Sequence, residues 1–504
     1  MQLLQSGTFQ VGYQNGFLRQ ITHEGAEVVR MMYFALRDHN WGTFAQKIED
    51  EIIVSREDSF SISYQSTNVG EVPDPIFEWK VRIEGDKEGT ITFEIQGKAL
   101  CAVRRNRAGF CILHPIQGTA EQPVTIFHED DSKTTTRFPR YISAPDPFLN
   151  IRAMQWQVGN GGGYHLDFEG DIFQTEDQRN WGDASYKTFC TPLSRPFPVQ
   201  LQEGDTVWQR VTLRPISIPE PSVLTEPEEK SLSIKNKIAI GIAASVETER
   251  LSEKAIALLK SLSLSHYRID LHLSESDWIT ICSNHCENAA LLDLPLEIAL
   301  FCSEAFEAQL ADFAGVCQQN ALNIKQLLLF SAKGLVTPQP LIDFIPTFKK
   351  QLLNVKIGVG TDYNFTELNR NRFEIGAADF VSCSFHPQEH AFDDLSMMEN
   401  TETVQYLVES AENLYHKPVH LSFISLKKRT NPYVTNPADF VLPIEKQLDS
   451  RQKTDFAKEW ATAVLQNLAH TNAVSATLFR TVGALGIMDE EGEEYPVYQA
   501  LAQK

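Results

Sequence analysis

The sequence is poor in cysteine, in positive charge and in long apolar runs, and each shortage excludes a class of protein. Eight cysteines in 504 residues, with no CxxC pair, are too few for a disulfide scaffold. There are 45 Lys and Arg against 66 Asp and Glu, a formal net charge of −21, whereas nucleic acids and anionic membranes are bound by clustered basic residues. No stretch approaches the roughly 18 consecutive apolar residues of a spanning helix. We therefore expect no nucleic-acid or membrane partner.

Targeting signals and short catalytic motifs are missing as well. The opening run MQLLQSGTFQVGYQNG has no basic start followed by an apolar segment, so the sequence predicts no signal peptide and a cytoplasmic location. G-x-S-x-G, the P-loop and H-E-x-x-H are all absent. Candidate chemistry must therefore be located through the expected fold.

The first part of the sequence, residues 1–215, has the pattern of an antiparallel sheet protein. Aromatic and β-branched residues alternate with polar ones, turn signals recur at about 8–12 residues, and long helical patterns are missing. This pattern predicts a β-sandwich in which each sheet has one solvated face. A proline-rich acidic stretch at 216–236 predicts an extended linker.

The second part, residues 237–490, alternates apolar strand segments with helical segments. Eight strands are expected, at 237–244, 266–273, 294–301, 324–330, 355–361, 379–385, 418–424 and 475–481. Eight βα units over about 250 residues predict a (β/α)8 TIM-like barrel, followed by a C-terminal tail at 491–504. The expected fold is thus an N-terminal antiparallel β-sandwich followed by a TIM-like barrel. A doubly wound sheet is the alternative, but no G-x-G-x-x-G follows the first strand.

Polar residues stand on the inward face of the second expected barrel strand. Alternation along HYRIDLHL turns His266, Arg268, Asp270 and His272 toward the interior. Buried charges are costly unless they are paired or bound to a ligand. Arg268 and Asp270 therefore either form a salt bridge that fills the barrel or take part in a site, and both readings stay open. Glu297 on the third strand faces inward by the same logic.

A polar loop follows the fifth expected strand, where a barrel builds its site. The run TDYNFTELNRNRF (361–373) carries Glu367, Asn369 and Arg370. A carboxylate among amide and guanidinium donors suits a polyhydroxylated substrate. The alternative is a solvated loop.

A second polar loop, FHPQEHAFDD (385–394), follows the sixth expected strand. It carries His386 and His390 four residues apart, with Asp393 close behind. Such a set could ligate a divalent metal, provide an acid or base near neutral pH, contact substrate, or be structural. We predict no cofactor, with a divalent metal as the less favoured possibility.

Two runs in the first part are dense in polar residues, Trp and Tyr: YFALRDHNWGTF (33–44) and GDIFQTEDQRNWGDASYKTF (170–189). They indicate either sugar recognition or a network at a domain interface.

Common barrel glycosidases carry two carboxylates at the ends of the fourth and seventh strands. The runs FSAKG (330–334) and SFISLKKR (422–429) offer none there, which argues against ordinary glycoside hydrolysis.

The chain resembles the D-apionate lactonase family over nearly its whole length. The resemblance is carried by YFALRDHNWGTF, NRAGFCILHP, EDQRNWGDASYKTFCTPL, FTELNRNR, PQEHAFDD and the pattern of Leu426, Arg429, Asn431 and Pro432. It implies a β-sandwich before a TIM-like barrel. It also implies opening of the lactone of a branched-chain sugar acid. Site candidates implied by the matching motifs are Glu367, Asn369, Arg370, His390 and Asp393.

The leading hypothesis is a sugar-lactone hydrolase whose partner is a small carbohydrate or sugar-acid lactone. Glu367 or His390 would activate water, and Asp270 would hold a neighbouring base or a hydroxyl. Arg268, Arg370 or Arg480 would stabilise the oxyanion. The other expected substrate contacts are Asn369, His386, Asp393 and Arg429.

Two alternatives remain. One is a TIM-barrel glycoside hydrolase that acts on an oligosaccharide. The other is a non-catalytic carbohydrate-binding homologue, because Arg480 stands where the family pattern has an acidic residue.

Overall fold

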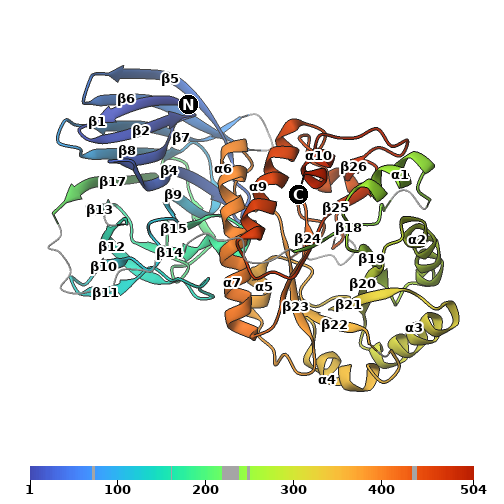
Figure 1. Ribbon diagram of the computed structural model, residues 1–504. Helices are drawn as coiled ribbons and strands as arrows, with labels where there is room; N and C mark the ends of the chain where they lie inside the picture. Colours follow the sequence, from blue (N-terminus) through green and yellow to red (C-terminus); the bar gives the residue numbers. More distant parts are fainter. Residues whose placement is uncertain are drawn as a thin grey trace. The chain divides into compact units, whose positions relative to one another are not determined.

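A computed structural model describes residues 1–70, 74–159, 162–217, 238–246, 250–352, 354–433 and 440–503 (Figure 1). The chain forms two compact units, of which the first comprises Met1–Gln178 and Ser185–Glu229. The second comprises Arg179–Ala184 and Lys230–Lys504. A six-residue segment from the first part of the sequence thus belongs to the second unit.

The strands described in the first unit are all paired antiparallel. Its strand network runs β5-β6-β7-β8-β17-β13-β12 and continues β14-β15-β9-β4-β3-β2-β1, with β10, β11 and β16 paired alongside. The strands are β1 Gln2–Ser6, β2 Phe9–Gln14, β3 Phe17–His23, β4 Ala26–Asp38, β5 Ala45–Ser55, β6 Phe60–Val69, β7 Pro75–Gly85, β8 Ile91–Ala99, β9 Val103–Pro115, β10 Pro123–His128, β11 Lys133–Arg137, β12 Phe148–Gln157, β13 Gly163–Glu169, β14 Phe173–Asp177, β15 Ser185–Phe189, β16 Val199–Leu201 and β17 Thr206–Ile216.

An aromatic core joins the two arms of this strand network, of which one runs from β5 to β12 and the other from β14 to β1. Phe34 on β4 packs against Trp79 on β7, with ring centroids 5.0 Å apart, and meets Phe93 on β8 edge-on. Phe93 in turn contacts Phe110 on β9 at 5.0 Å. All four side chains are buried. Since β4 and β9 belong to one arm and β7 and β8 to the other, the sheet folds over on itself, and the predicted sandwich class is confirmed.

The second unit is a closed barrel of eight parallel strands. Each strand pairs with the next, and β18 pairs with β25 to close the ring. The strands are β18 Ala239–Ala243, β19 Tyr267–His272, β20 Leu296–Cys302, β21 Ile324–Ser331, β22 Lys356–Gly360, β23 Phe380–Phe385, β24 Val419–Ile424 and β25 Ser475–Val482. These are the eight strands expected from the sequence, so the predicted TIM-like barrel is confirmed.

Helices surround the barrel (Figure 1). They are α1 Glu253–Ser261, α2 Trp278–Leu292, α3 Phe306–Asn320, α4 Gln339–Phe348, α5 Phe365–Arg370, α6 Asp394–Glu399, η2 Asn400–Glu402, α7 Thr403–Tyr415, α8 Ile444–Gln447, α9 Asp455–Ala469 and α10 Val497–Ala502, with η1 Gln178–Trp181 between β14 and β15. A short strand β26, Gly486–Met488, pairs with β25. Helix α10 lies in the predicted tail, and its residues Val497 and Leu501 are buried. Residues 218–236 of the predicted linker lie outside the described residues, and Ile216 ends β17.

The interior of the barrel contains a buried polar network around Glu297. Its carboxylate accepts hydrogen bonds from Ser422 at 2.6 Å and Thr477 at 2.9 Å, and it also bonds Gln326. Burial raises the pKa of Glu297, but the charges of His266 and Arg268 and the Ser422 bond outweigh it and hold the pKa at about 2. The inward direction expected for Glu297 is therefore observed, with every contact made to other barrel residues.

Within the described ranges, no helix combines the length and the apolar character needed to cross a membrane.

Candidate active site

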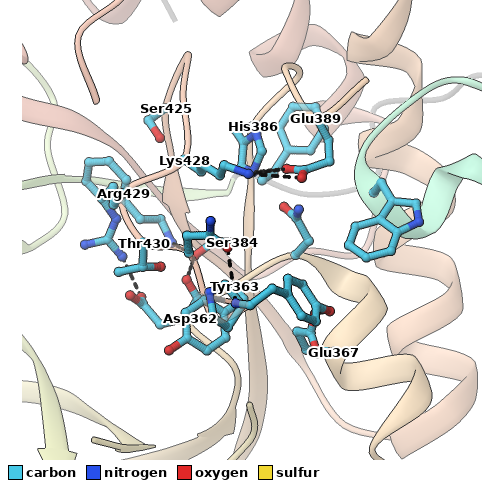
Figure 2. A pocket seen from close by; sticks show the side chains of 17 residues that line it. Asp362, Tyr363, Glu367, Ser384, His386, Glu389, Ser425, Lys428, Arg429 and Thr430 are labelled. Atoms are coloured by element: carbon cyan, nitrogen blue, oxygen red, sulfur yellow. Dashed lines mark hydrogen bonds and ion pairs between the residues drawn. The ribbon is translucent and has the colours of Figure 1, made fainter. Parts of the chain in front are cut away.

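A cavity lies beyond the carboxyl ends of β22, β23 and β24 (Figure 2). This is the end of a TIM barrel at which its loops build active sites. The cavity is lined by Trp181, Asp362, Tyr363, Asn364, Glu367, Ser384, Phe385, His386, Glu389, Phe423, Ser425, Lys428, Arg429, Thr430, Asn431, Pro432 and Tyr433. Three of the predicted site residues, Glu367, His386 and Arg429, meet in this lining, and His390 is not part of it.

Glycine allows the strands to approach closely where the cavity begins. Gly360, the last residue of β22, has a φ of +145°, and a Cβ at this position would clash with the carbonyl oxygen of Ser382 on β23. Two residues later, Asp362 reaches the cavity. The close approach thus places the loop after β22 beside the end of β23.

A ring of four charges holds one wall of the cavity. Arg268 binds Asp270 through Nε at 2.8 Å and Asp362 through Nη2 at 2.8 Å. Arg429 binds the same two carboxylates, Asp270 at 2.8 Å and Asp362 at 2.5 Å. Burial raises the pKa of Asp270, but the surrounding guanidinium groups outweigh it and hold the pKa well below its usual range. Arg268 and Asp270 thus form the salt bridge considered above, and that bridge also anchors the cavity residue Arg429.

Three guanidinium groups surround the ring of Phe423, at centroid distances of 4.5 Å for Arg429, 5.5 Å for Arg480 and 5.8 Å for Arg268. Arg480 donates to the carbonyl oxygen of Ala244 at 2.6 Å and is buried. Burial, together with the neighbouring Arg429 charge, lowers the pKa of Arg480 to about 10. Arg480 and Arg268 lie outside the cavity lining, and the substrate contact predicted for them stays a prediction.

The Glu367 carboxyl group, on α5, faces the cavity from a buried position. Burial raises its pKa above the usual value, while a hydrogen bond from the Tyr433 hydroxyl and the charge of Arg370 act in the opposite direction. Figure 2 shows Glu367 on the helix beside Tyr363. A carboxyl group with a raised pKa in a cavity is a candidate proton acceptor near neutral pH.

A second carboxyl group, that of Glu389, has a pKa that is shifted in the opposite direction from that of Glu367. Lys428 donates to Glu389 Oε1 at 3.0 Å, and His386 Nε2 lies 3.7 Å from Oε2. Burial raises the pKa of Glu389, but the nearby His386, which is protonated only in the acidic range where Glu389 titrates, and the charge of Lys428 outweigh it and lower the pKa. Burial also lowers the pKa of His386 to about 4, so its imidazole is neutral at pH 7. The Lys428–Glu389 contact is visible in Figure 2.

His390 is not among the lining residues, and its Nδ1 lies 2.6 Å from Oδ2 of Asp183. Asp183 belongs to the segment Arg179–Ala184, which is part of the barrel unit. The same segment brings Trp181 into the cavity wall. Sequence reasoning placed neither Trp181 nor Asp183 beside the barrel loops.

Three further predicted residues have structural contacts instead of a place in the lining. Asn369 is buried and donates to Asn180 at 2.9 Å. The guanidinium group of Arg370 lies over the ring of Trp181, 5.3 Å from its centroid. Asp393 caps helix α6 by accepting from the Ser396 backbone N–H. The substrate contacts predicted for these residues stay untested.

Sequence reasoning did not single out the lining residues Glu389, Lys428 and Tyr433, whereas Trp181 lies in the run 170–189 for which sugar recognition or a domain-interface network was expected. Glu389 lies inside the FHPQEHAFDD run, so a carboxylate between two histidines was a usable signal. Lys428 follows the seventh strand directly, where barrel loops contribute to sites. Tyr433 carries no local signal for its position, because tertiary contacts determine it.

No group of three or more His, Cys, Asp or Glu side chains arranged to hold a metal ion is found within the described part of the chain. His386, His390 and Asp393, considered above as ligands, have the separate contacts just given.

Known families match both units of the chain. A model of the N-terminal domain of D-apionate lactonase matches residues 1–217, and a model of its TIM barrel domain matches residues 240–504. A curated protein named D-apionate lactonase, from Brucella anthropi, is 30% identical over 519 residues, which cover 97% of this chain and 84% of that protein.

Two solved structures share a distant likeness with this chain. A GH30 endoxylanase from Clostridium papyrosolvens is 11% identical, covers 53% of this chain and 72% of its own, and has a TM-score of 0.34. A fungal β-1,4-galactanase is also 11% identical, covers 53% of this chain and 99% of its own, and has a TM-score of 0.37.

Proposed function

The chain belongs to the D-apionate lactonase family, and from that premise we propose that it is a hydrolase that opens the ring of a sugar-acid lactone. The observation that carries the proposal is the Glu367 carboxyl group, which lines the barrel cavity with a pKa raised by burial. The lactone of D-apionate is the first substrate to test, because the curated relative is named for it.

Glu367 acts as the proton acceptor in the proposed reaction. It takes a proton from a water molecule while the water oxygen forms a bond to the lactone carbonyl carbon, and the carbonyl electron pair moves onto oxygen. When this tetrahedral intermediate collapses, the bond between the carbonyl carbon and the ring oxygen breaks. Glu367 then returns its proton to the departing ring oxygen, so that the carboxylate is regenerated. The product is the open hydroxy acid, which ionises at neutral pH.

Lys428 stabilises the oxyanion in this scheme. Its ammonium group lies in the cavity lining and donates to both oxygens of Glu389, at 3.0 and 3.4 Å. An ammonium group has three donors, so one is available to the developing negative charge. Arg429 is the less suitable group, because its guanidinium is already bound to Asp270 and Asp362.

The proposal is tested by measuring acid release from the D-apionate lactone and from other five- and six-membered aldonolactones in a pH-stat. We expect Glu367→Gln to lower kcat by about 10²- to 10⁴-fold, the usual contribution of a positioned acid or base. Glu374→Gln is the matched control, because Glu374 lies just beyond the same helix and is exposed. Failure to open any lactone faster than buffer, or full activity of Glu367→Gln, contradicts the proposal.

A glycoside hydrolase is the second candidate, and one observation favours it. Glu367 and Glu389 line one cavity, and their surroundings shift their pKa values in opposite directions, as in enzymes that use one carboxylic acid and one carboxylate. They follow the fifth and sixth strands, and not the fourth and seventh. Release of nitrophenol from nitrophenyl glycosides, without lactone opening, would establish this candidate. Binding of a sugar acid with neither activity would indicate the non-catalytic homologue.

A further inference from the structure

We propose that Trp181 is the surface on which the sugar ring of the substrate stacks. The segment Arg179–Ala184 thereby becomes a specificity-determining part of the barrel site. This inference rests on the proposed function, since it concerns the same cavity. The ligand class is a single furanose or pyranose ring of a sugar-acid lactone.

Trp181 is the one residue of its segment that is not fully buried. Arg179, Asn180, Gly182, Asp183 and Ala184 are all buried, whereas Trp181 is partly exposed and lines the cavity. A tryptophan with a purely structural role in this unit looks different: Trp460 is completely buried. Leaving part of a large apolar ring uncovered is unfavourable, and the apolar C–H face of a sugar is the partner that would cover it.

Hydrogen bonds fix the segment on both sides of Trp181. On one side, the Asn369 amide donates to Asn180 Oδ1 at 2.9 Å. On the other side, the Ala184 backbone N–H donates to Asn400 Oδ1 at 2.9 Å. Together with the bond between Asp183 and His390, these contacts tie the segment to the loops after β22 and β23. The indole ring is therefore held in place before any ligand arrives, which lowers the entropy cost of binding.

Gly182 allows the segment Arg179–Ala184 to approach the backbone of His386, which lines the cavity. Its φ is +92°, and a Cβ at this position would lie 2.7 Å from the backbone oxygen of His386. Only glycine combines this backbone conformation with such a close approach. The residue next to Trp181 thus packs directly on the backbone of a cavity-lining histidine.

The surroundings of the indole ring orient it further. The Arg370 guanidinium lies 5.3 Å from the ring centroid, and the His390 ring meets the indole edge-on at 6.0 Å. Tyr433, the hydrogen-bond partner of Glu367, has its ring 6.2 Å from the indole. A sugar ring placed on Trp181 would therefore lie beside the Glu367–Tyr433 pair. Trp181 positions the ring, and Glu367 acts on its lactone group.

The inference is tested with Trp181→Ala and Trp181→Phe in the full-length protein. We expect Trp181→Ala to raise KM about 10-fold or more, with a smaller change in kcat, and Trp181→Phe to restore KM to within about 3-fold, as for loss and partial rescue of an aromatic contact. Trp208→Phe is the matched control, since Trp208 is an exposed tryptophan of the first unit. An unchanged KM in Trp181→Ala overturns the inference.

A binding measurement separates this inference from the proposed function. The sugar acid formed by hydrolysis of the lactone is titrated while tryptophan fluorescence is recorded. We expect quenching in the wild type and in Trp208→Phe, and its loss in Trp181→Phe at an unchanged Tm. If no lactone is hydrolysed, loss of quenching in Trp181→Phe still supports the stacking surface. Quenching that persists in Trp181→Phe contradicts it, whether or not the enzyme is active.

Discussion

Asp183 and His390, 207 positions apart in the chain, are joined by a contact of 2.6 Å between Oδ2 and Nδ1. The Asp183 carboxylate accepts a hydrogen bond from a proton on Nδ1 and so fixes the direction of the imidazole ring. The same contact ties the Arg179–Ala184 segment to the loop after β23. The pair therefore holds the wall that carries Trp181.

The first prediction concerns this pair. We expect His390→Ala to raise KM and to lower the free energy of unfolding by about 1.5–3 kcal/mol, the cost of losing a hydrogen bond to a charged group. His390→Asn, whose amide can donate in place of Nδ1, should recover most of both losses. Steady-state kinetics and urea unfolding provide the two readings. A His390→Asn protein as stable as the wild type but without kcat would instead identify the imidazole as a proton carrier.

The second prediction concerns the Tyr433 hydroxyl, whose hydrogen bond lowers the pKa of Glu367. Tyr433→Phe removes this bond, so the pKa of Glu367 rises further. Because the proposed base must be ionised to act, the acidic limb of the kcat/KM profile should move to higher pH. The profile is recorded from pH 4 to 9 for both proteins. A limb that stays in place or moves to lower pH contradicts the assignment of Glu367 as the base.

The third prediction concerns Lys428 as the oxyanion donor. We expect Lys428→Met to lower kcat by about 10²- to 10³-fold, the range found when one such donor is removed, with little change in KM. Lys427→Met is the control, because the neighbouring Lys427 donates to the Leu448 carbonyl oxygen and is not part of the lining. Equal losses of kcat in the two variants would assign the effect to the loop and not to the ammonium group.

The fourth prediction concerns the four-charge ring. Asp270→Asn leaves Arg268 and Arg429 with one carboxylate between them, and breaking a buried pair costs about 3–5 kcal/mol. We expect a fall of this size in the free energy of unfolding of the barrel, measured with urea, and a raised KM because the Arg429 loop loosens. Asp277→Asn serves as the control, since Asp277 makes no side-chain cap hydrogen bond at the start of α2. A change within about 0.5 kcal/mol, the usual effect of a surface substitution, contradicts the prediction.

The barrel could be predicted because its strands are short apolar runs with both faces covered. The run LPLEIALF, for example, corresponds to β20, and all seven residues of that strand are buried. The polar residues within such runs were also placed correctly, since alternation alone turns Arg268 and Glu297 inward. Strand periodicity is a local property, and the sequence contains it.

The loop residues could be predicted only in part. Glu367, His386 and Arg429 reach the cavity, but Asn369 turns to Asn180, which lies 189 positions earlier in the chain. No local pattern predicts such a partner, because side-chain direction in a loop depends on what packs against it. The same reason explains why Tyr433 was missed.

The position of Arg179–Ala184 also has a consequence for how substrate range can evolve in this family. The segment is encoded between two strands of the first unit, yet it belongs to the barrel unit and supplies part of its cavity wall. Recombination that exchanged the N-terminal half between relatives would therefore replace Trp181 and Asp183 while leaving Glu367 and Lys428 untouched. Such a hybrid would inherit its catalytic groups from one parent and its sugar-facing surface from the other. Substrate range could then diverge through the half of the gene that encodes no barrel strand.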